Sequence, residues 1–134
     1  MELSAARELF AGARVARLAT VRPGGRPHLV PIVFAMDGDV IVTAVDDAKA
    51  KRTRALTRLA NIAAEPRVSV LADHFDEDWS QLWWVRADGV AVVVDRDADA
   101  IALLADRYRQ YREQLPPGPV IRIQVDRWTG WAAE

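Results

Sequence analysis

Apolar positions along the chain change their spacing several times, and each change marks the boundary of a predicted element. Residues 4–13 carry apolar side chains at helical spacing behind Ser4, which we expect to cap a short helix. Residues 15–21 and 28–36 are instead rich in apolar and β-branched side chains, as buried strands are. The segment 22–26 between them contains proline and two glycines, which predicts a hairpin of two antiparallel strands.

The rest of the chain alternates helices with strands in the same way. Residues 50–64 and 97–113 each form one apolar stripe at helical spacing, and prolines follow both segments, so we predict two further helices. The pair Asp88-Gly89 predicts a bulge inside a long strand. Segments rich in Val, Ile and Trp predict the remaining strands, which cover residues 40–45, 67–75, 82–95 and 120–131.

These elements predict a mainly β (α+β) fold with about three helices. About six antiparallel strands are expected to curl into a small barrel, because closure removes exposed strand edges. The 134 residues fit one such domain, spanning 1–134. Both faces of the strand 28–36 are apolar, and the neighbours Trp83 and Trp84 must point to opposite faces of their own strand. Helices or a second subunit must therefore cover the outside, and we expect a homodimer.

Composition narrows the possible chemistry. Hydrophobic residues make up 51% of the chain and charged residues 28%, which is typical of a packed globular protein. The formal net charge of -1 argues against a nucleic-acid partner, whose recognition depends on excess positive charge. The absence of cysteine excludes thiol nucleophiles and disulfides, and the two histidines lack metal-ligand spacing, so no metal is expected. No apolar run approaches a membrane span, and we expect a cytoplasmic protein.

Five positive charges gather at the start of the predicted helix 50–64. At about 100° per residue, Arg52 falls on the buried side of this helix. A buried guanidinium needs an anion, and the free N–H groups and dipole of a helix N-terminus favour the same anion, so we predict a phosphate site. An ion pair of Arg52 with Asp46 or Asp47 is the alternative. The five residues are Lys49, Lys51, Arg52, Arg54 and Arg58.

Few other residues offer chemistry of their own. Pro31 belongs either at a sheet edge or where a strand opens towards a ligand. The hydroxyl of Thr43 could bind the phosphate or a neighbouring carbonyl. His28 could donate a proton or be structural, and the acids around His74 are typical of an exposed loop rather than a cation site. An enzyme with so few acid–base groups needs a cofactor for the difficult chemistry.

Three stretches together resemble the pyridoxamine 5'-phosphate oxidase-like proteins, which are FMN-binding-like split β-barrels. They are residues 17–32, containing RLATVRP and GRPHLVPI, the basic helix, and residues 65–71, EPRVSVL. Residues 78–89 are similar to the actinobacterial branch of that family, which uses the deazaflavin coenzyme F-420. The resemblance covers nearly the whole chain.

The resemblance implies a homodimer of six-stranded split barrels with two cofactor sites at the subunit interface. It also implies hydride transfer between F-420 and a small organic acceptor, with the protein orienting one against the other. By position, Val30, Pro31, Ile32 and Val33 would lie along the cofactor ring, Thr43 and Ala44 near its ribityl chain, and Lys49, Lys51 and Arg52 around its phosphate. Trp83, Trp84 or Arg86 would come from the partner subunit.

The chain departs from the vitamin B6 oxidases near its C-terminal end. Those enzymes carry an Arg-x-His substrate motif there, whereas this chain has the sequence DRWTGW over residues 126–131, which argues against pyridoxamine phosphate as the substrate. Two alternatives stay open. One is FMN in place of F-420, because similar basic groups would hold either phosphate, and the other is a carrier that binds the cofactor without turnover.

Overall fold

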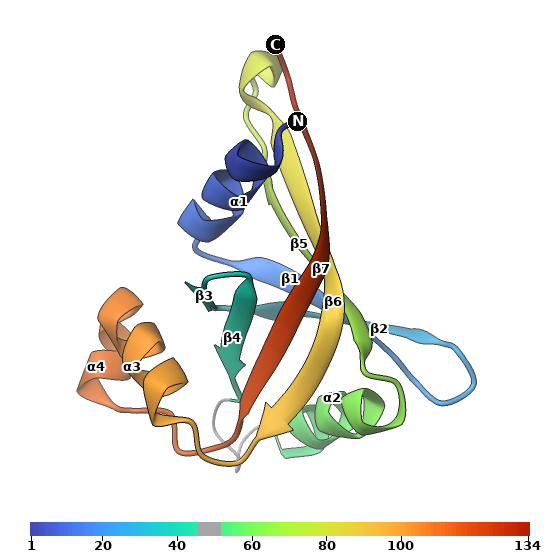
Figure 1. The fold of residues 1–134 in the computed structure, drawn as a ribbon, viewed down its shortest axis with the longest axis vertical. Coiled ribbons are helices and arrows are strands. Elements are labelled where there is room, and N and C mark those ends of the chain that lie inside the picture. The colour runs from blue at the N-terminus through green and yellow to red at the C-terminus, as the bar shows by residue number, and fades with distance from the viewer. Residues whose placement is uncertain (46–51) are drawn as a thin grey trace.

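One antiparallel sheet forms the centre of the molecule (Figure 1). The computed structural model describes residues 1–45 and 52–134. The strand order is β2-β1-β5-β6-β7-β4-β3, so the edge strands β2 and β3 are also neighbours in sequence, and the sheet has to curl to bring them together at residues 33–34. The strands are β1 (Ala16–Val21), β2 (Pro27–Ile32), β3 (Ala35–Asp37), β4 (Val40–Ala44), β5 (Arg67–His74), β6 (Trp83–Val94) and β7 (Val120–Ala132).

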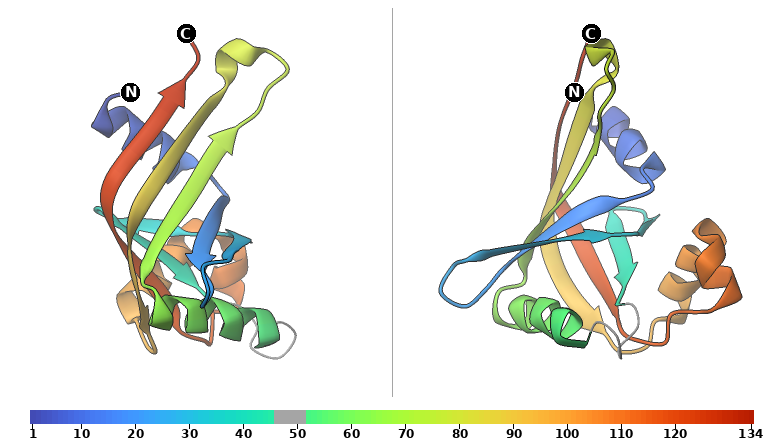
Figure 2. Two further views of the ribbon diagram at one scale, coloured as in Figure 1. Left: turned by 90° about the vertical axis from the view of Figure 1, so that its right-hand side faces the viewer. Right: turned by 180° about the vertical axis from the view of Figure 1, so that it is seen from behind.

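Helices pack on both faces of this sheet (Figures 1 and 2). The helices α1 (Leu3–Gly12) and α2 (Arg52–Ala64) lie on the concave inner face, where Phe10 and Ile62 join the main core. The helices α3 (Ala98–Arg107) and α4 (Arg109–Glu113) lie on the outer face at the β3–β4 end. A single 3-10 turn, η1 (Trp79–Gln81), forms the tip of the long β5–β6 hairpin.

Two separate cores hold these layers together. In the inner core, the ring of Phe10 contacts those of Phe34 and Trp128, with centroids 4.9 Å and 5.1 Å apart. In the outer core, Leu104 of α3 packs with Val42 and Val120, and all three are fully buried. Complete burial of such a side chain contributes about 1.5–3 kcal/mol, so both cores are substantial.

The turn chemistry predicted from the sequence is confirmed. Gly24 and Gly25 in the β1–β2 hairpin have φ of 92° and 94°, values that only glycine adopts readily. The register between β6 and β7 shifts at Asp88/Gly89, where the bulge was predicted. A Cβ at Gly89 would collide with the carbonyl oxygen of Gln124, so the bulge also requires glycine for close approach of the two backbones.

Three predictions about the fold are wrong in detail. The sheet is open and has seven strands rather than six in a closed barrel, because the predicted strand 28–36 is divided after Ile32 into β2 and β3. The predicted helix 97–113 is divided at Tyr108 into α3 and α4. Ser4 lies inside α1 and caps nothing, since the N-cap position is Glu2.

Candidate functional site

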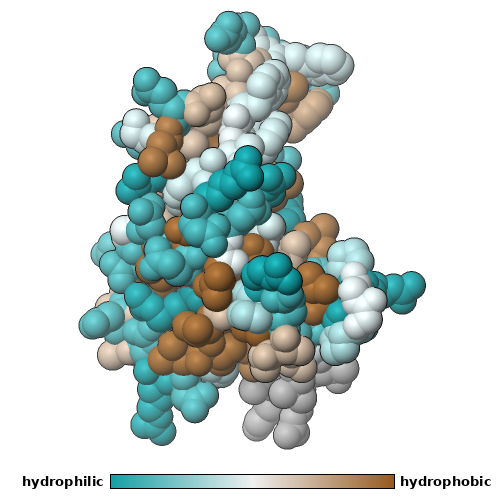
Figure 3. All heavy atoms as spheres, turned by 45° about the vertical axis from the view of Figure 1, so that its right-hand side comes forward, coloured by the Kyte–Doolittle hydropathy of each residue, from teal (hydrophilic) through white to brown (hydrophobic). Residues whose placement is uncertain are grey.

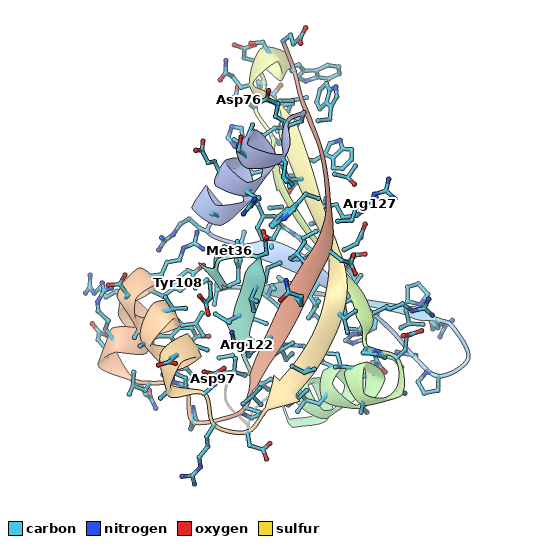
Figure 4. The ribbon with its side chains drawn as sticks, viewed as in Figure 1. Met36, Asp76, Asp97, Tyr108, Arg122 and Arg127 are labelled. Atoms are coloured by element: carbon cyan, nitrogen blue, oxygen red, sulfur yellow. The ribbon has the colours of Figure 1, made fainter. Side chains whose placement is uncertain are left out.

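The break between β2 and β3 is fixed by side chains from other elements. The hydroxyl of Thr43 donates to the carbonyl of Val33 over 2.8 Å. The Tyr108 hydroxyl lies 2.9 Å from the Phe34 carbonyl and accepts from the Phe34 N–H over 3.2 Å. These bonds take the place of ladder hydrogen bonds at 33–34, which explains why the strand is divided here. Figure 4 shows Tyr108 between the α3–α4 pair and β3.

Arg107 completes this junction without a carboxylate. Its guanidinium donates to the carbonyls of Phe34, over 2.8 Å, and of Ala13. It also stacks 4.8 Å from the centroid of the Phe34 ring. Burial lowers the pKa of Arg107, and the neighbouring charge of Arg14 acts in the same direction. Carbonyl oxygens and an aromatic face therefore stabilise this cation, and its charge is directed into the junction.

The four residues predicted to follow a cofactor ring, Val30 to Val33, do not share one face. Val30 and Ile32 point inward, and Ile32 is only 6% exposed, so a ligand could touch Ile32 only through its backbone. Pro31 points outward and is exposed, and Val33 packs beneath α3 and α4. Among the described residues β2 pairs only with β1, so backbone N–H and C=O groups along its other edge are open to a ligand. Pro31 is thus an edge proline, one of its two predicted settings.

Thr43 and Ala44, at the end of β4, lie next to the segment 30–33, and Thr43 bonds Val33 directly. Both side chains are buried, Thr43 to 1% exposure, and the Thr43 hydroxyl uses its proton on Val33, which is the structural role foreseen for it. The chain beyond β4 leads to α2, whose first residue is Arg52. Lys49 and Lys51, like Asp46 and Asp47, lie outside the described residues.

His28 faces α2 from the base of the β1–β2 hairpin. It is the cross-strand partner of Thr20, whose hydroxyl accepts from the Asn61 amide of α2 over 3.1 Å. The Nδ1 atom of His28 is buried and has no hydrogen-bond partner among the described residues. Burial, and then the positive charges of Arg22 and Arg58, lower the pKa of His28, so the imidazole is neutral at neutral pH. Two arginines and an unpartnered ring nitrogen make this end of β2 favourable for an anion.

The two tryptophans of β6 point to opposite faces, as predicted. Trp83 packs against the inner core, whereas Trp84 lines a groove on the outer face with a volume of about 500 Å³. Leu29, Leu71 and Arg86 line the same groove. Arg86 is held by Asp88 at 3.2 Å, and Asp88 also accepts from the hydroxyl of Ser69 over 2.6 Å. Trp84 and Arg86 therefore lie together in an open groove, and Trp83 lies apart from them.

A cavity of about 490 Å³ between α4 and the strand break contains residues that the sequence did not single out. Val33 lines it from the strand break, and Tyr108, Tyr111, Gln110 and Gln114 line it from the end of α3 and from α4. The carbonyl of Pro119, in the loop that bounds it, accepts from the N–H of Val45 just beyond β4. The amphipathic pattern of 97–113 predicted these tyrosines as core, and Tyr111 is indeed buried in the outer core with Tyr108 packed against it. The pattern did not predict that both also line a cavity.

The acidic loop at the β5–β6 tip has internal partners. Asp76 accepts from the N–H of Asp78, over 2.7 Å, and Asp78 accepts from the N–H and hydroxyl of Ser80. In the described part of the chain, no three His, Asp or Glu side chains converge in a way that could hold a metal ion. No helix there is long and apolar enough to cross a membrane.

Comparison with known proteins identifies the family to which this architecture belongs. The sequence profile of the family described as "Pyridoxamine 5'-phosphate oxidase" matches residues 3–132. The chain belongs to this family. No curated protein matches it.

Solved structures of this family's fold come from several bacteria. A conserved hypothetical protein from Mycobacterium tuberculosis aligns with a TM-score of 0.77 and 23% identity, over 98% of this chain and 85% of that one. A FAD-binding protein from Mycobacterium smegmatis aligns with a TM-score of 0.69 and 20% identity, over 100% and 98% of the two chains. A heme storage protein from Vibrio cholerae aligns with a TM-score of 0.70 and 22% identity, over 98% and 95%. These likenesses establish the shared fold, and the proteins that share it bind different cofactors.

Proposed function

We propose that this protein is an F-420-dependent oxidoreductase that reduces a small organic acceptor. The observation that carries the proposal is the open edge of β2, taken together with the basic residues that the sequence places at the start of α2. A deazaflavin has a flat ring with an alternating carbonyl and N–H edge, and its phosphate is an anion. An unpaired strand edge suits the first feature and a basic helix start suits the second.

The residues present fit such a cofactor. Backbone groups of residues 30–33 would hold the ring edge, and Pro31 would contact its face. Lys49, Lys51 and Arg52 would hold the phosphate, and the charges of Arg22 and Arg58 beside His28 would add positive potential at the hairpin end of β2. When bound, reduced F-420 supplies a hydride, and the acceptor takes up this hydride together with one proton from water. The protein itself binds the cofactor and the acceptor, orients one against the other and excludes water from the site.

We further propose that a second copy of the chain completes the site. The outer face formed by β2, β1, β5 and β6 leaves Leu29 67% and Leu71 37% exposed, and Trp84 of β6 lines the groove on this face. Figure 3 shows hydrophobic side chains among hydrophilic ones on this flank of the molecule. Apolar side chains mixed with paired charges such as Arg17–Asp73 are typical of an interface between subunits. Trp84 and Arg86 would then face the partner's cofactor.

Titration of the purified protein with F-420 and with FMN, followed by fluorescence or calorimetry, tests the proposal. We expect F-420 to bind at least tenfold more tightly than FMN. Arg52→Ala should weaken F-420 binding by about 1.5–3 kcal/mol, the usual value of a charge-assisted hydrogen bond. Arg109→Ala, at an exposed residue that pairs with Glu113 of the same helix, is the matched control. Binding of neither cofactor would refute the proposed site.

An FMN-dependent oxidoreductase is the second candidate, supported by the FAD-binding relative of the same fold. A preference for FMN in the same titration, with yellow protein on overexpression, would favour it. A carrier is the third candidate, since a heme storage protein also has this fold. Tight F-420 binding with no reduction of any quinone or enone offered would favour the carrier.

A further inference from the structure

In the described part of the chain, 1–45 and 52–134, the cavity between α4 and the strand break is lined by no charged residue. Val33, Tyr108, Gln110, Tyr111, Gln114 and Leu115 form it, together with the prolines of the turn that follows. Two further cavities have mixed linings. One, beside the start of β5, contains Glu65, Arg67, Asp88 and Asp126, and the other, the Trp84 groove, contains Arg17, Asp73 and Arg86. In a chain that is 28% charged, an uncharged lining of this size distinguishes the α4 cavity from its surroundings.

The neighbouring charges are bound elsewhere. Arg107 donates to the carbonyls of Phe34 and Ala13. Arg112 turns back onto α3 and donates to the carbonyls of Ala105 and Asp106, over 3.1 Å and 2.8 Å. Arg109 and Glu113 pair with each other at 3.3 Å on the exposed side of α4. All four charged side chains of residues 107–113 thus have partners outside the cavity.

The polar groups that remain are amides. Among the described residues, the side-chain amides of Gln110 and Gln114 form no hydrogen bond across the cavity, and each carries N–H donors and a carbonyl acceptor. Tyr108 and Tyr111 contribute rings, at 6.1 Å between centroids and nearly perpendicular. Aromatic faces and neutral amides suit a flat molecule that carries carbonyl oxygens and no charge.

We propose that this cavity binds an uncharged, conjugated carbonyl compound such as a quinone. Val33 lines the cavity and also ends the segment along which the cofactor ring would lie, so the compound would sit beside that ring. Its role as the hydride acceptor rests on the proposed function, whereas its binding does not. The described lining residues offer an anionic acceptor no partner charge in return for its lost hydration, so we expect the cavity to favour the neutral compound.

Two probes of nearly equal shape test the selectivity. Binding of 1,4-naphthoquinone and of 1,4-naphthoquinone-2-sulfonate is measured by calorimetry, with the protein alone and again with F-420 added. The chain has no cysteine with which quinones could react. We expect the neutral quinone to bind at least tenfold more tightly than the sulfonate in both settings. Equal affinities, or tighter binding of the sulfonate, would overturn the proposal.

A charge introduced at Gln114, an exposed residue of the cavity lining, tests whether the quinone binds in this cavity. Gln114→Lys should narrow the preference for the neutral quinone by tightening sulfonate binding several-fold, and Gln114→Glu should weaken both probes, the sulfonate more. Gln81→Glu is the matched control, because Gln81 is an exposed glutamine of η1 in the loop that also carries Asp76, far from Tyr108 (Figure 4). Unchanged affinities in both Gln114 variants would show that the quinone binds elsewhere.

The cofactor titration separates the two claims. Selective quinone binding by a protein that ignores F-420 would support the cavity and refute the proposed reaction. F-420 binding without quinone selectivity would refute the cavity alone.

Discussion

The two halves of the outer sheet face differ in what covers them. At the β3–β4 end, α3 and α4 lie over the strands, and Val42 and Val120 are fully buried. At the β2–β1–β5–β6 end no helix in the described residues lies over the strands, and Leu29 is 67% exposed. Both halves carry outward-facing apolar side chains, so each half is expected to be covered by a helix or by another chain. The chain supplies one cover itself, and we propose that a second copy supplies the other.

Removing a contact under α3 should have the largest effect. Leu104→Ala leaves a cavity in the covered half, and we expect the free energy of unfolding to fall by about 2–5 kcal/mol in a urea titration. Leu29→Ala, measured at a concentration where the protein is monomeric, should change it by less than about 0.5 kcal/mol. Similar losses at both positions would mean that the two halves do not differ as described.

A charge placed on the bare half should prevent association. Leu71→Arg replaces an apolar side chain of the groove with a guanidinium between Arg17 and Arg86, its cross-strand neighbours. We expect the dissociation constant of the dimer to rise at least about 100-fold, equivalent to about 2.7 kcal/mol. Sedimentation equilibrium measures the change, and circular dichroism checks that the fold is retained. Leu3→Arg, at an exposed leucine of α1, should leave the dimer intact. If both variants associate like the unmodified protein, the interface lies elsewhere.

Loosening the end of α3 should have an intermediate effect. Asp97 caps this helix by accepting from the N–H of Ala100, and it pairs with Arg122 of β7 at 2.9 Å (Figure 4). The bond from Ala100, and then Arg122, lower the pKa of Asp97, so this stabilisation is present above the ordinary carboxyl pKa and is lost as the pH falls below it. Asp97→Ala should reduce the free energy of unfolding by about 1–2 kcal/mol at neutral pH. Asp97→Asn, which keeps a capping oxygen, should cost less.

The smallest effect concerns pH and His28. Because the pKa of His28 is lower in the folded protein than its ordinary value of about 6.5, the unfolded chain binds a proton more readily as the pH falls. Stability should therefore be highest above about pH 7 and decline towards pH 5. His28→Gln should flatten this decline in thermal melts, and His74→Gln, at an exposed histidine of β5, serves as the control. An unchanged slope in His28→Gln would show that another group is responsible.

Much of the fold could be predicted from local sequence. The β1–β2 hairpin and the bulge at Gly89 follow from glycine and proline at positions where the backbone requires them. The two divided elements could not be predicted, because neither break has a local signal. The strand ends after Ile32 because Thr43 and Tyr108, distant in sequence, bond the backbone of residues 33–34.

The candidate site was predicted in part. The position of Pro31 at an edge, and of Trp83 and Trp84 on opposite faces, follows from strand geometry and is confirmed. The α4 cavity could not be predicted from the sequence, because Tyr108 and Tyr111 also fit the apolar stripe of one long, undivided helix. Its uncharged lining depends on where Arg107 and Arg112 turn, and only tertiary structure determines that.

Sedimentation velocity of the protein mixed with F-420, recorded at the visible absorbance of the cofactor, tests the central claim most directly. We predict that the cofactor travels with a species of about twice the chain mass of 14.9 kDa. Cofactor that stays unbound, or that travels with a species of the chain mass itself, would contradict a cofactor site completed by two copies of the chain.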